Sequence, residues 1–289
     1  IRSRYDNVFI TNSSGFTATM GIISGSSPIC KNFTVQDGFT GNFRLTTGIS
    51  IYGNVQWRKG AYLSENTGMT LMYDNTQITP NLIDIPSDIY WINNTSYDDY
   101  GGWGYTKSAY VYLTGNGKWK LINDLGGDHF DMALTIQDNA SLDTNSKNIT
   151  VKNFNYNSST VSDFGNIVIN TTFANINDKV NLSNSTINNT THSYYSNYNI
   201  NSPGLTFTKQ QTVKKITASA NMYKPAISST IGVLNVDEMV MNSNATFSGL
   251  ISVNNLNLNN LIYSLDNTNI NYYLQINQSF TANVSCKGI

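Results

Sequence analysis

Residues 250–259, Leu-Ile-Ser-Val-Asn-Asn-Leu-Asn-Leu-Asn, alternate aliphatic side chains with polar ones, chiefly asparagine. Side chains at a period of two point to opposite faces of a strand, so this segment is predicted to be a β-strand with one apolar and one polar face. Similar short runs bounded by Gly, Asn or Asp recur along the chain, including 49–52, 109–113 and 149–151. The chain is therefore predicted to be all-β.

Helical spacing is scarce, because Asn, Gly and Thr interrupt most stretches that would otherwise place apolar residues on one helical face. Two short helices are expected, over 81–85 and 236–241.

Two β architectures fit the alternation. Asparagine between aliphatic residues is suited to the bends of a right-handed parallel β-helix, in which successive coils stack similar side chains. No fixed period persists over three copies, however. An elongated antiparallel β-sandwich with long curved strands needs no repeat and is therefore the favoured prediction, with the β-helix as the alternative.

The composition limits the function classes. Only 12% of the 289 residues are charged and the net charge is -1, while Asn, Ser and Thr are abundant. Such a surface is typical of secreted, extracellular β proteins. Nucleic acid is an unsuitable partner, because phosphate binding needs clustered cations. No apolar run approaches the roughly 20 residues that a membrane-spanning helix needs.

The chain opens at Ile1 without a methionine, which predicts a mature or trimmed form. A missing N-terminal segment is a candidate docking point for a bacterial pilus tip protein.

Two domains are predicted from a change in composition near residue 139. Residues 1–138 are rich in aromatic residues and glycine and form a candidate receptor-binding β domain, and residues 139–289 form an Asn/Ser/Thr-rich β domain. The two cysteines, Cys30 and Cys286, are expected to form a disulfide in an oxidising compartment, with two independent buried thiols as the alternative.

Aromatic residues crowd between 90 and 119, with glycines among them. Tyr and Trp stack on sugar faces and settle at bilayer headgroups, so exposed rings here are the best candidate binding surface. Loop-like sequence favours exposure of four rings: Tyr97, Tyr100, Trp103 and Tyr105. Strand-like sequence favours core packing of three others: Tyr110, Tyr112 and Trp119.

Catalysis has little support in the sequence, and no enzyme activity, cofactor or metal is expected. The histidines His129 and His192 are far apart, and the segment 126–131 offers at most three metal ligands in one loop. A carbohydrate-active enzyme on an all-β scaffold would need a carboxylate pair about 5 to 10 Å apart. The acids to test for that activity are Asp98, Asp99, Asp128 and Asp131.

The segment 180–186, Val-Asn-Leu-Ser-Asn-Ser-Thr, and the Ser/Thr/Tyr-rich run that follows it to residue 208 resemble the stem region of aerolysin-like and epsilon-toxin-like β-pore-forming proteins. The resemblance covers about residues 139–255 and implies a pore-former-like β body preceded by an aromatic receptor-binding region. Pro203 and Gly204 depart from it, because they would break a continuous membrane strand. The chain is also similar in type to secreted colonisation factors associated with type IVb pili.

These observations predict a secreted colonisation factor or adhesin that binds a host cell membrane or surface glycan. A structural β-helical adhesin or fibre segment is one alternative, and the carbohydrate-active enzyme is the other.

Overall fold

The computed structural model describes residues 3–11, 17–20, 28–37, 39, 42–45, 47–57, 61–64, 68–72, 79–85, 90–93, 109–126, 132–190, 204–219, 226–242, 246–259, 268–276 and 284–286. Within these ranges the chain forms strands and turns and contains no helix, which confirms the all-β prediction. No membrane-spanning helix is found in the same part of the chain.

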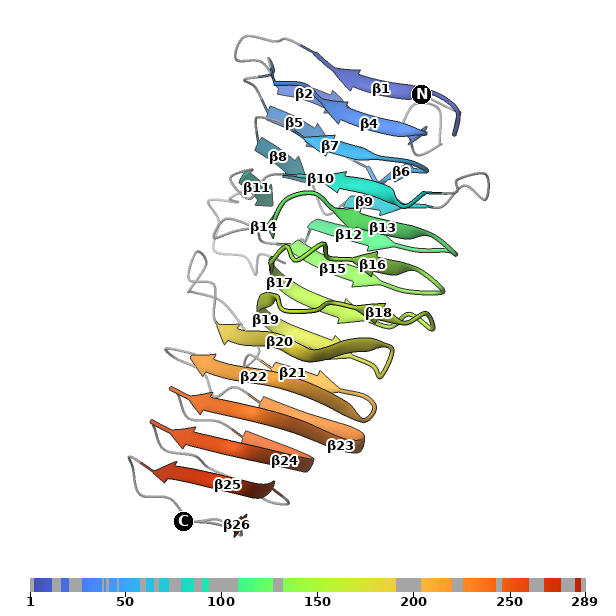
Figure 1. Ribbon diagram of the computed structural model, residues 1–289. Coiled ribbons are helices and arrows are strands. Elements are labelled where there is room, and N and C mark those ends of the chain that lie inside the picture. Colours follow the sequence, from blue (N-terminus) through green and yellow to red (C-terminus); the bar gives the residue numbers. More distant parts are fainter. Residues whose placement is uncertain are drawn as a thin grey trace. The chain divides into compact units, whose positions relative to one another are not determined.

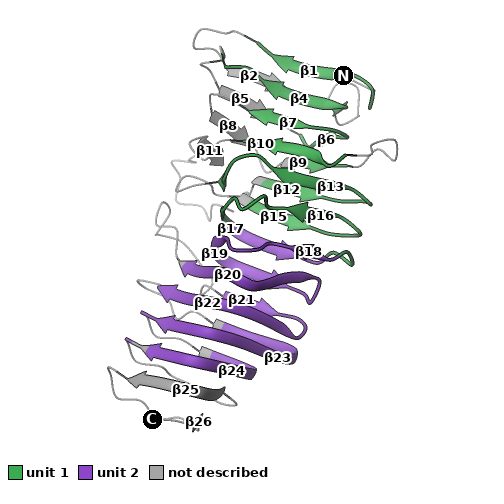
Figure 2. Cartoon of the chain, viewed as in Figure 1, with its two compact units in different colours: residues 1–151, 158–160 green, residues 152–157, 161–289 purple. Residues whose placement is uncertain are grey.

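The chain forms two compact units (Figure 2). Unit 1 comprises residues 1–151 and 158–160, and unit 2 comprises residues 152–157 and 161–289. The domain boundary expected from composition, between residues 138 and 139, stays a prediction.

The strands of unit 1 are distributed among three sheets, and each sheet takes every third strand along most of the chain (Figure 1). The first sheet contains β1 (Asn7–Ile10), β4 (Asn32–Val35), β7 (Val55–Trp57), β10 (Asn81–Asp84), β13 (Lys118–Leu121) and β16 (Ser141–Asp143). The second contains β2 (Thr17–Met20), β5 (Asn42–Leu45), β8 (Ala61–Ser64) and β11 (Tyr90–Asn93). The third begins with β3 (Ile29–Cys30), β6 (Ile49–Ile51), β9 (Gly68–Leu71), β12 (Ala109–Leu113) and β15 (Met132–Ile136), and β14 (Leu125–Gly126) pairs with the start of β17 (Ile149–Tyr156).

Unit 2 contains longer strands. They are β18 (Ser162–Asp163), β19 (Val168–Ile176), β20 (Val180–Thr190), β21 (Gly204–Phe207), β22 (Gln211–Ser219), β23 (Ala226–Met241), β24 (Thr246–Leu258), β25 (Thr268–Ile276) and β26 (Val284–Cys286). The first part of β23 pairs with β21 and its later part pairs with β22, so β23 runs through a corner that separates those two strands. Because β21 also pairs with β19, the five strands β19, β20, β22, β23 and β21 form a closed ring of pairings.

Rows of apolar side chains stack in the interior of each unit. In unit 1, Cys30, Ile51, Leu71, Leu113 and Ile136 occupy matching positions on neighbouring strands, and all five are buried. Stacking of side chains at one register position of successive strands removes apolar surface from water, which is the main favourable term in folding.

A similar row in unit 2 joins Val213, Val236 and Val253, which are buried partners on β22, β23 and β24. The outward neighbours of these residues are consequently held in register as well.

The favoured architecture was wrong in strand direction. Every ladder with an assigned register in the described residues is parallel, whereas a sandwich of the expected kind is antiparallel. A chain that supplies one strand in turn to each of three sheets must cross over between parallel neighbours, and this winding is the one expected of the alternative, a parallel β-helix.

Both expected helices are strands. Residues 81–84 form β10, and residues 236–241 end β23. Ile83 and Ile85, and likewise Met239 and Met241, are buried at the strand period of two, so burial overrides the weak helical spacing.

Candidate functional site

Three neighbouring strands of unit 2 break the normal alternation of inward and outward side chains at matching positions, and we call this place the unit 2 corner. On β22, Lys214 is exposed and the next residue, Lys215, is half-buried, between the buried Val213 and Ile216. Two consecutive side chains thus point outward at this position. The same arrangement occurs on β23 at Asp237 and its neighbour Glu238.

The next strand repeats this corner with Asn254 and Asn255 between Val253 and Leu256. Because Val213, Val236 and Val253 are register partners, the residues that follow them also stack from strand to strand. The outward rows at the corner are therefore fixed by the valines below them.

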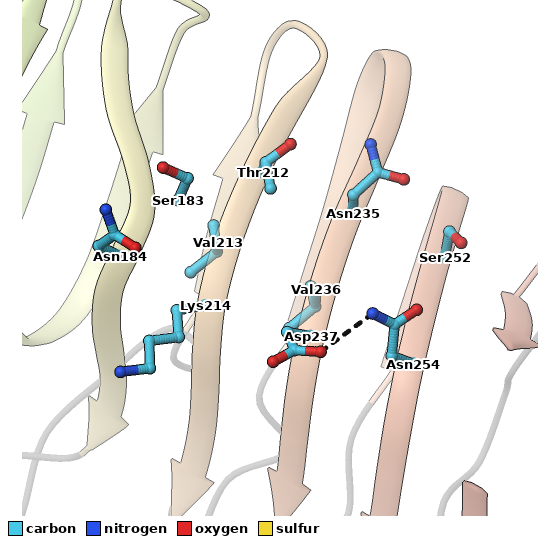
Figure 3. A pocket seen from close by; sticks show the side chains of 10 residues that line it. All are labelled: Ser183, Asn184, Thr212, Val213, Lys214, Asn235, Val236, Asp237, Ser252 and Asn254. Carbon is cyan, nitrogen blue, oxygen red and sulfur yellow. Dashed lines mark hydrogen bonds between the residues drawn. The ribbon is translucent and has the colours of Figure 1, made fainter. Parts of the chain in front are cut away.

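A shallow groove of about 350 Å³ lies over this corner (Figure 3). Its walls come from four strands, β20, β22, β23 and β24, which are parallel neighbours in the sheet. The residues that line it are Ser183, Asn184, Thr212, Val213, Lys214, Asn235, Val236, Asp237, Ser252 and Asn254. We call this feature the unit 2 groove.

Asp237 is the central acceptor of the unit 2 groove. Its Oδ1 accepts a hydrogen bond of 3.0 Å from Nδ2 of Asn254, drawn as the dashed line in Figure 3. Nδ2 of Asn255 donates to the backbone carbonyl of Asp237 at 3.3 Å. A carboxylate has about four lone-pair positions, so Asp237 retains acceptor capacity for a ligand after these contacts.

Four further polar side chains in the groove have no side-chain hydrogen bond or ion pair to any described residue: Asn184, Thr212, Lys214 and Asn235. The amides and hydroxyl can donate and accept, and the ammonium of Lys214 can donate three hydrogen bonds. In Figure 3 its Nζ points away from Asp237, on the side of Asn184. These groups can bind a polar ligand without breaking an existing contact.

The neighbouring outward row is already paired. Nζ of Lys215 lies 2.8 Å from Oε1 of Glu238, in an ion pair whose side chains are 35% and 47% exposed. Lys215 and Glu238 thus provide matched partners for Lys214 and Asp237, since they have the same chemistry one residue along the chain and lie outside the groove lining.

A second, smaller hollow of about 250 Å³ lies on the first sheet of unit 1 and includes the exposed Phe9. Its amides bond mainly to one another and to the backbone. Nδ2 of Asn32 donates to Oδ1 of Asn7 at 2.7 Å, and Oδ1 of Asn32 accepts from the backbone N–H of Asn54 at 2.7 Å. These bonds tie the coils together and leave fewer free groups than the unit 2 groove has.

The four aromatic residues predicted to bind, Tyr97, Tyr100, Trp103 and Tyr105, lie outside the described residues. Of the rings predicted to pack in the core, Trp119 is fully buried. Tyr110 and Tyr112 are half-buried on the outward side of β12, with ring centroids 4.5 Å apart. Burial, and then the neighbouring Tyr112, raise the pKa of the Tyr110 hydroxyl.

The acids considered for catalysis, Asp98, Asp99, Asp128 and Asp131, and both histidines also lie outside the described ranges. Within those ranges, no group of three or more His, Cys, Asp or Glu residues is placed to hold a metal ion.

Cys30 is a buried free thiol on β3. The structure describes the backbone of Cys286 in β26 but not its side chain, and its described part contains no disulfide. Burial raises the pKa of the Cys30 thiol to about 12, so this thiol is a poor nucleophile in the folded protein.

The unit 2 groove was not anticipated from the sequence, although a local signal for it exists. The segments 213–216, 236–239 and 253–256 read Val-Lys-Lys-Ile, Val-Asp-Glu-Met and Val-Asn-Asn-Leu. Each places two polar residues between two apolar ones. Aligning these three phrases would have brought Lys214, Asp237 and Asn254 together.

No protein-family model, no curated protein and no solved structure matches this chain.

Proposed function

We propose that this chain is a secreted, extracellular protein that binds surface glycans through the unit 2 groove, in the manner of an adhesin or colonisation factor. The observation that carries the proposal is the set of four polar side chains that line the groove and have no side-chain partner among the described residues, Asn184, Thr212, Lys214 and Asn235. A hydroxyl-rich ligand can exchange its water hydrogen bonds for bonds to these amides, hydroxyls and charged groups.

The charge of the groove supports a neutral ligand. Its lining contains one cation, Lys214, and one anion, Asp237, so it has no excess of either sign. The low content of charged residues in the whole chain, 12%, supports an extracellular location, since such a composition is typical of secreted β proteins.

The test is binding to a panel of immobilised polysaccharides with two matched pairs of variants. Asp237→Asn and Lys214→Gln each remove one charged group from the groove, and each is expected to weaken binding about tenfold, the loss of roughly one charge-assisted hydrogen bond.

Glu238→Gln and Lys215→Gln make the same chemical changes outside the groove and should leave binding unchanged. The proposed site would be refuted if Asp237→Asn weakened binding no more than Glu238→Gln and Lys214→Gln no more than Lys215→Gln. It would also be refuted if the wild-type protein bound no polysaccharide.

A structural β-helical adhesin or fibre segment is a second candidate, favoured by the parallel ladders of both units. We propose right-handed winding for it, because crossover connections between parallel strands are almost always right-handed. Binding to host membranes, pore formation and docking to a pilus tip stay predictions, which dye release from liposomes and pull-down with pilus proteins would test.

A further inference from the structure

The polar side chains of the unit 2 groove are arranged in two rows that cross the strands. Thr212, Asn235 and Ser252 are register partners on β22, β23 and β24. The second row, Lys214, Asp237 and Asn254, follows the stacked valines on the same three strands. Figure 3 shows both rows crossing from one strand to the next.

The rows have a built-in repeat distance. Neighbouring strands of a sheet lie about 4.8 Å apart, so equivalent side chains in the groove recur at that spacing. An extended chain of β-1,4-linked pyranose units advances by a similar distance for each sugar. A ligand of that kind can present one sugar unit to each strand without losing register over four strands.

We propose that the ligand of the unit 2 groove is a linear, neutral, β-1,4-linked glycan that lies across the strands, with about one sugar unit for each of β20, β22, β23 and β24. This inference rests on the proposed function and specifies its ligand. Lys214, Asp237 and Asn254 would contact successive units, and Ser183 with Asn184 would contact the unit at the β20 end.

A short terminal epitope is a poorer match for this surface. Recognition of one or two sugars needs several polar groups that converge on one position. Here the groups are spread over four strands and repeat along the groove instead.

The experiment is calorimetric titration of the whole chain with two neutral series of one to six units, cello-oligosaccharides and N-acetylchito-oligosaccharides. In at least one series, affinity is expected to rise at least tenfold between two and four units and to change little beyond four.

Asn184→Ala removes a polar group at the β20 end, and the plateau should then be reached at three units. Asn188→Ala is the matched control, because Asn188 is on the same strand and donates to Asn170 outside the groove. That variant should reproduce the wild-type series.

Affinity that is the same for all lengths would overturn the linear arrangement while leaving glycan binding intact. Failure of both series to bind, with a polysaccharide of the panel still bound, would overturn the 1,4-linked ligand. Failure of both series and of the whole panel would overturn the proposed function as well.

Discussion

Asp138 illustrates how a single side chain can hold a turn between strands. It has a positive φ of 58°, an uncommon conformation for a residue with a side chain, and its Oδ2 accepts hydrogen bonds from the Thr114 hydroxyl and from the Gly115 backbone N–H. These two contacts lower the pKa of the Asp138 carboxyl, the Thr114 hydrogen bond being the larger cause. Both contacts connect this turn to the preceding coil of unit 1.

The lowered pKa predicts a pH dependence of stability. A carboxyl whose pKa is lower in the folded state stabilises the protein above its unfolded pKa of about 3.9, and this contribution is lost as the pH falls through the folded value. Asp138→Asn should therefore reduce the urea midpoint at pH 7 and should show a smaller further decrease on acidification below about pH 4 than the wild-type protein.

The change in stability is expected to be modest, because Asp138 is exposed and solvent screens the charge of its carboxylate. Asp163→Asn is a suitable comparison, since Asp163 is also exposed and accepts a backbone hydrogen bond within its own turn. Wild-type and Asp138→Asn proteins with parallel pH profiles would contradict the role given to this carboxylate.

Cys30 gives a second prediction about a single residue. Because burial raises the pKa of its thiol to about 12, iodoacetamide should modify Cys30 very slowly at pH 8 in the folded Cys286→Ser variant and rapidly in denaturant. Mass spectrometry of the modified protein measures both rates. Fast modification under native conditions would contradict the buried position of Cys30. Modification of the unreduced wild-type protein in denaturant would show whether Cys30 and Cys286 form the expected disulfide.

Among the elements, the corner at which β23 passes from β21 to β22 depends on a glycine of the neighbouring strand β24. Gly249 has a φ of +83°, and a Cβ built there would lie 1.9 Å from the backbone oxygen of Ser229. Any side chain must therefore displace the neighbouring strand as well as adopt a strained conformation.

Gly249→Ala should destabilise unit 2 by about 3 kcal/mol or more, as measured by urea unfolding. Gly115→Ala separates the two causes, because Gly115 has a φ of +78° and no atom within 4 Å of its built Cβ. It should cost only the conformational part, about 1 to 2 kcal/mol. Equal costs for both variants would show that Gly249 does not contact Ser229 closely.

The strands could be predicted from the sequence, but the interruption of the alternation inside β19 could not. Of the runs recognised from alternation, 49–52 contains β6 (Ile49–Ile51), 109–113 is β12, and 149–151 begins β17. In β19, by contrast, Thr171 and Thr172 are consecutive and both buried, which departs from the alternation of a regular strand. The Thr171 hydroxyl lies 3.1 Å from the carbonyl oxygen of Lys152 and 2.8 Å from that of Phe173 and can donate its one proton to either. A threonine can therefore occupy the interior, and composition alone does not reveal this.

At the scale of the whole molecule, strand direction was the feature that sequence could not decide. Stacked partners are separated by very different lengths of chain: 25 residues between Asn7 and Asn32, 39 between Asp84 and Asn123, and 17 between Asp237 and Asn254. A search for a fixed period therefore fails even though the strands stack. The groove was hidden for the same reason, since its residues come from four distant segments.

The glycan site is tested most directly by photoaffinity labelling with a diazirine-carrying hexasaccharide of the 1,4-linked series that binds, followed by mapping of the modified peptides. A glycan bound across these strands should label the peptides that contain residues 183–184, 212–214, 235–237 and 252–254, and the labelling should be weaker in Asp237→Asn but unchanged in Glu238→Gln. Labels confined to one of these segments, or found only in unit 1, would contradict a glycan site built from four parallel strands.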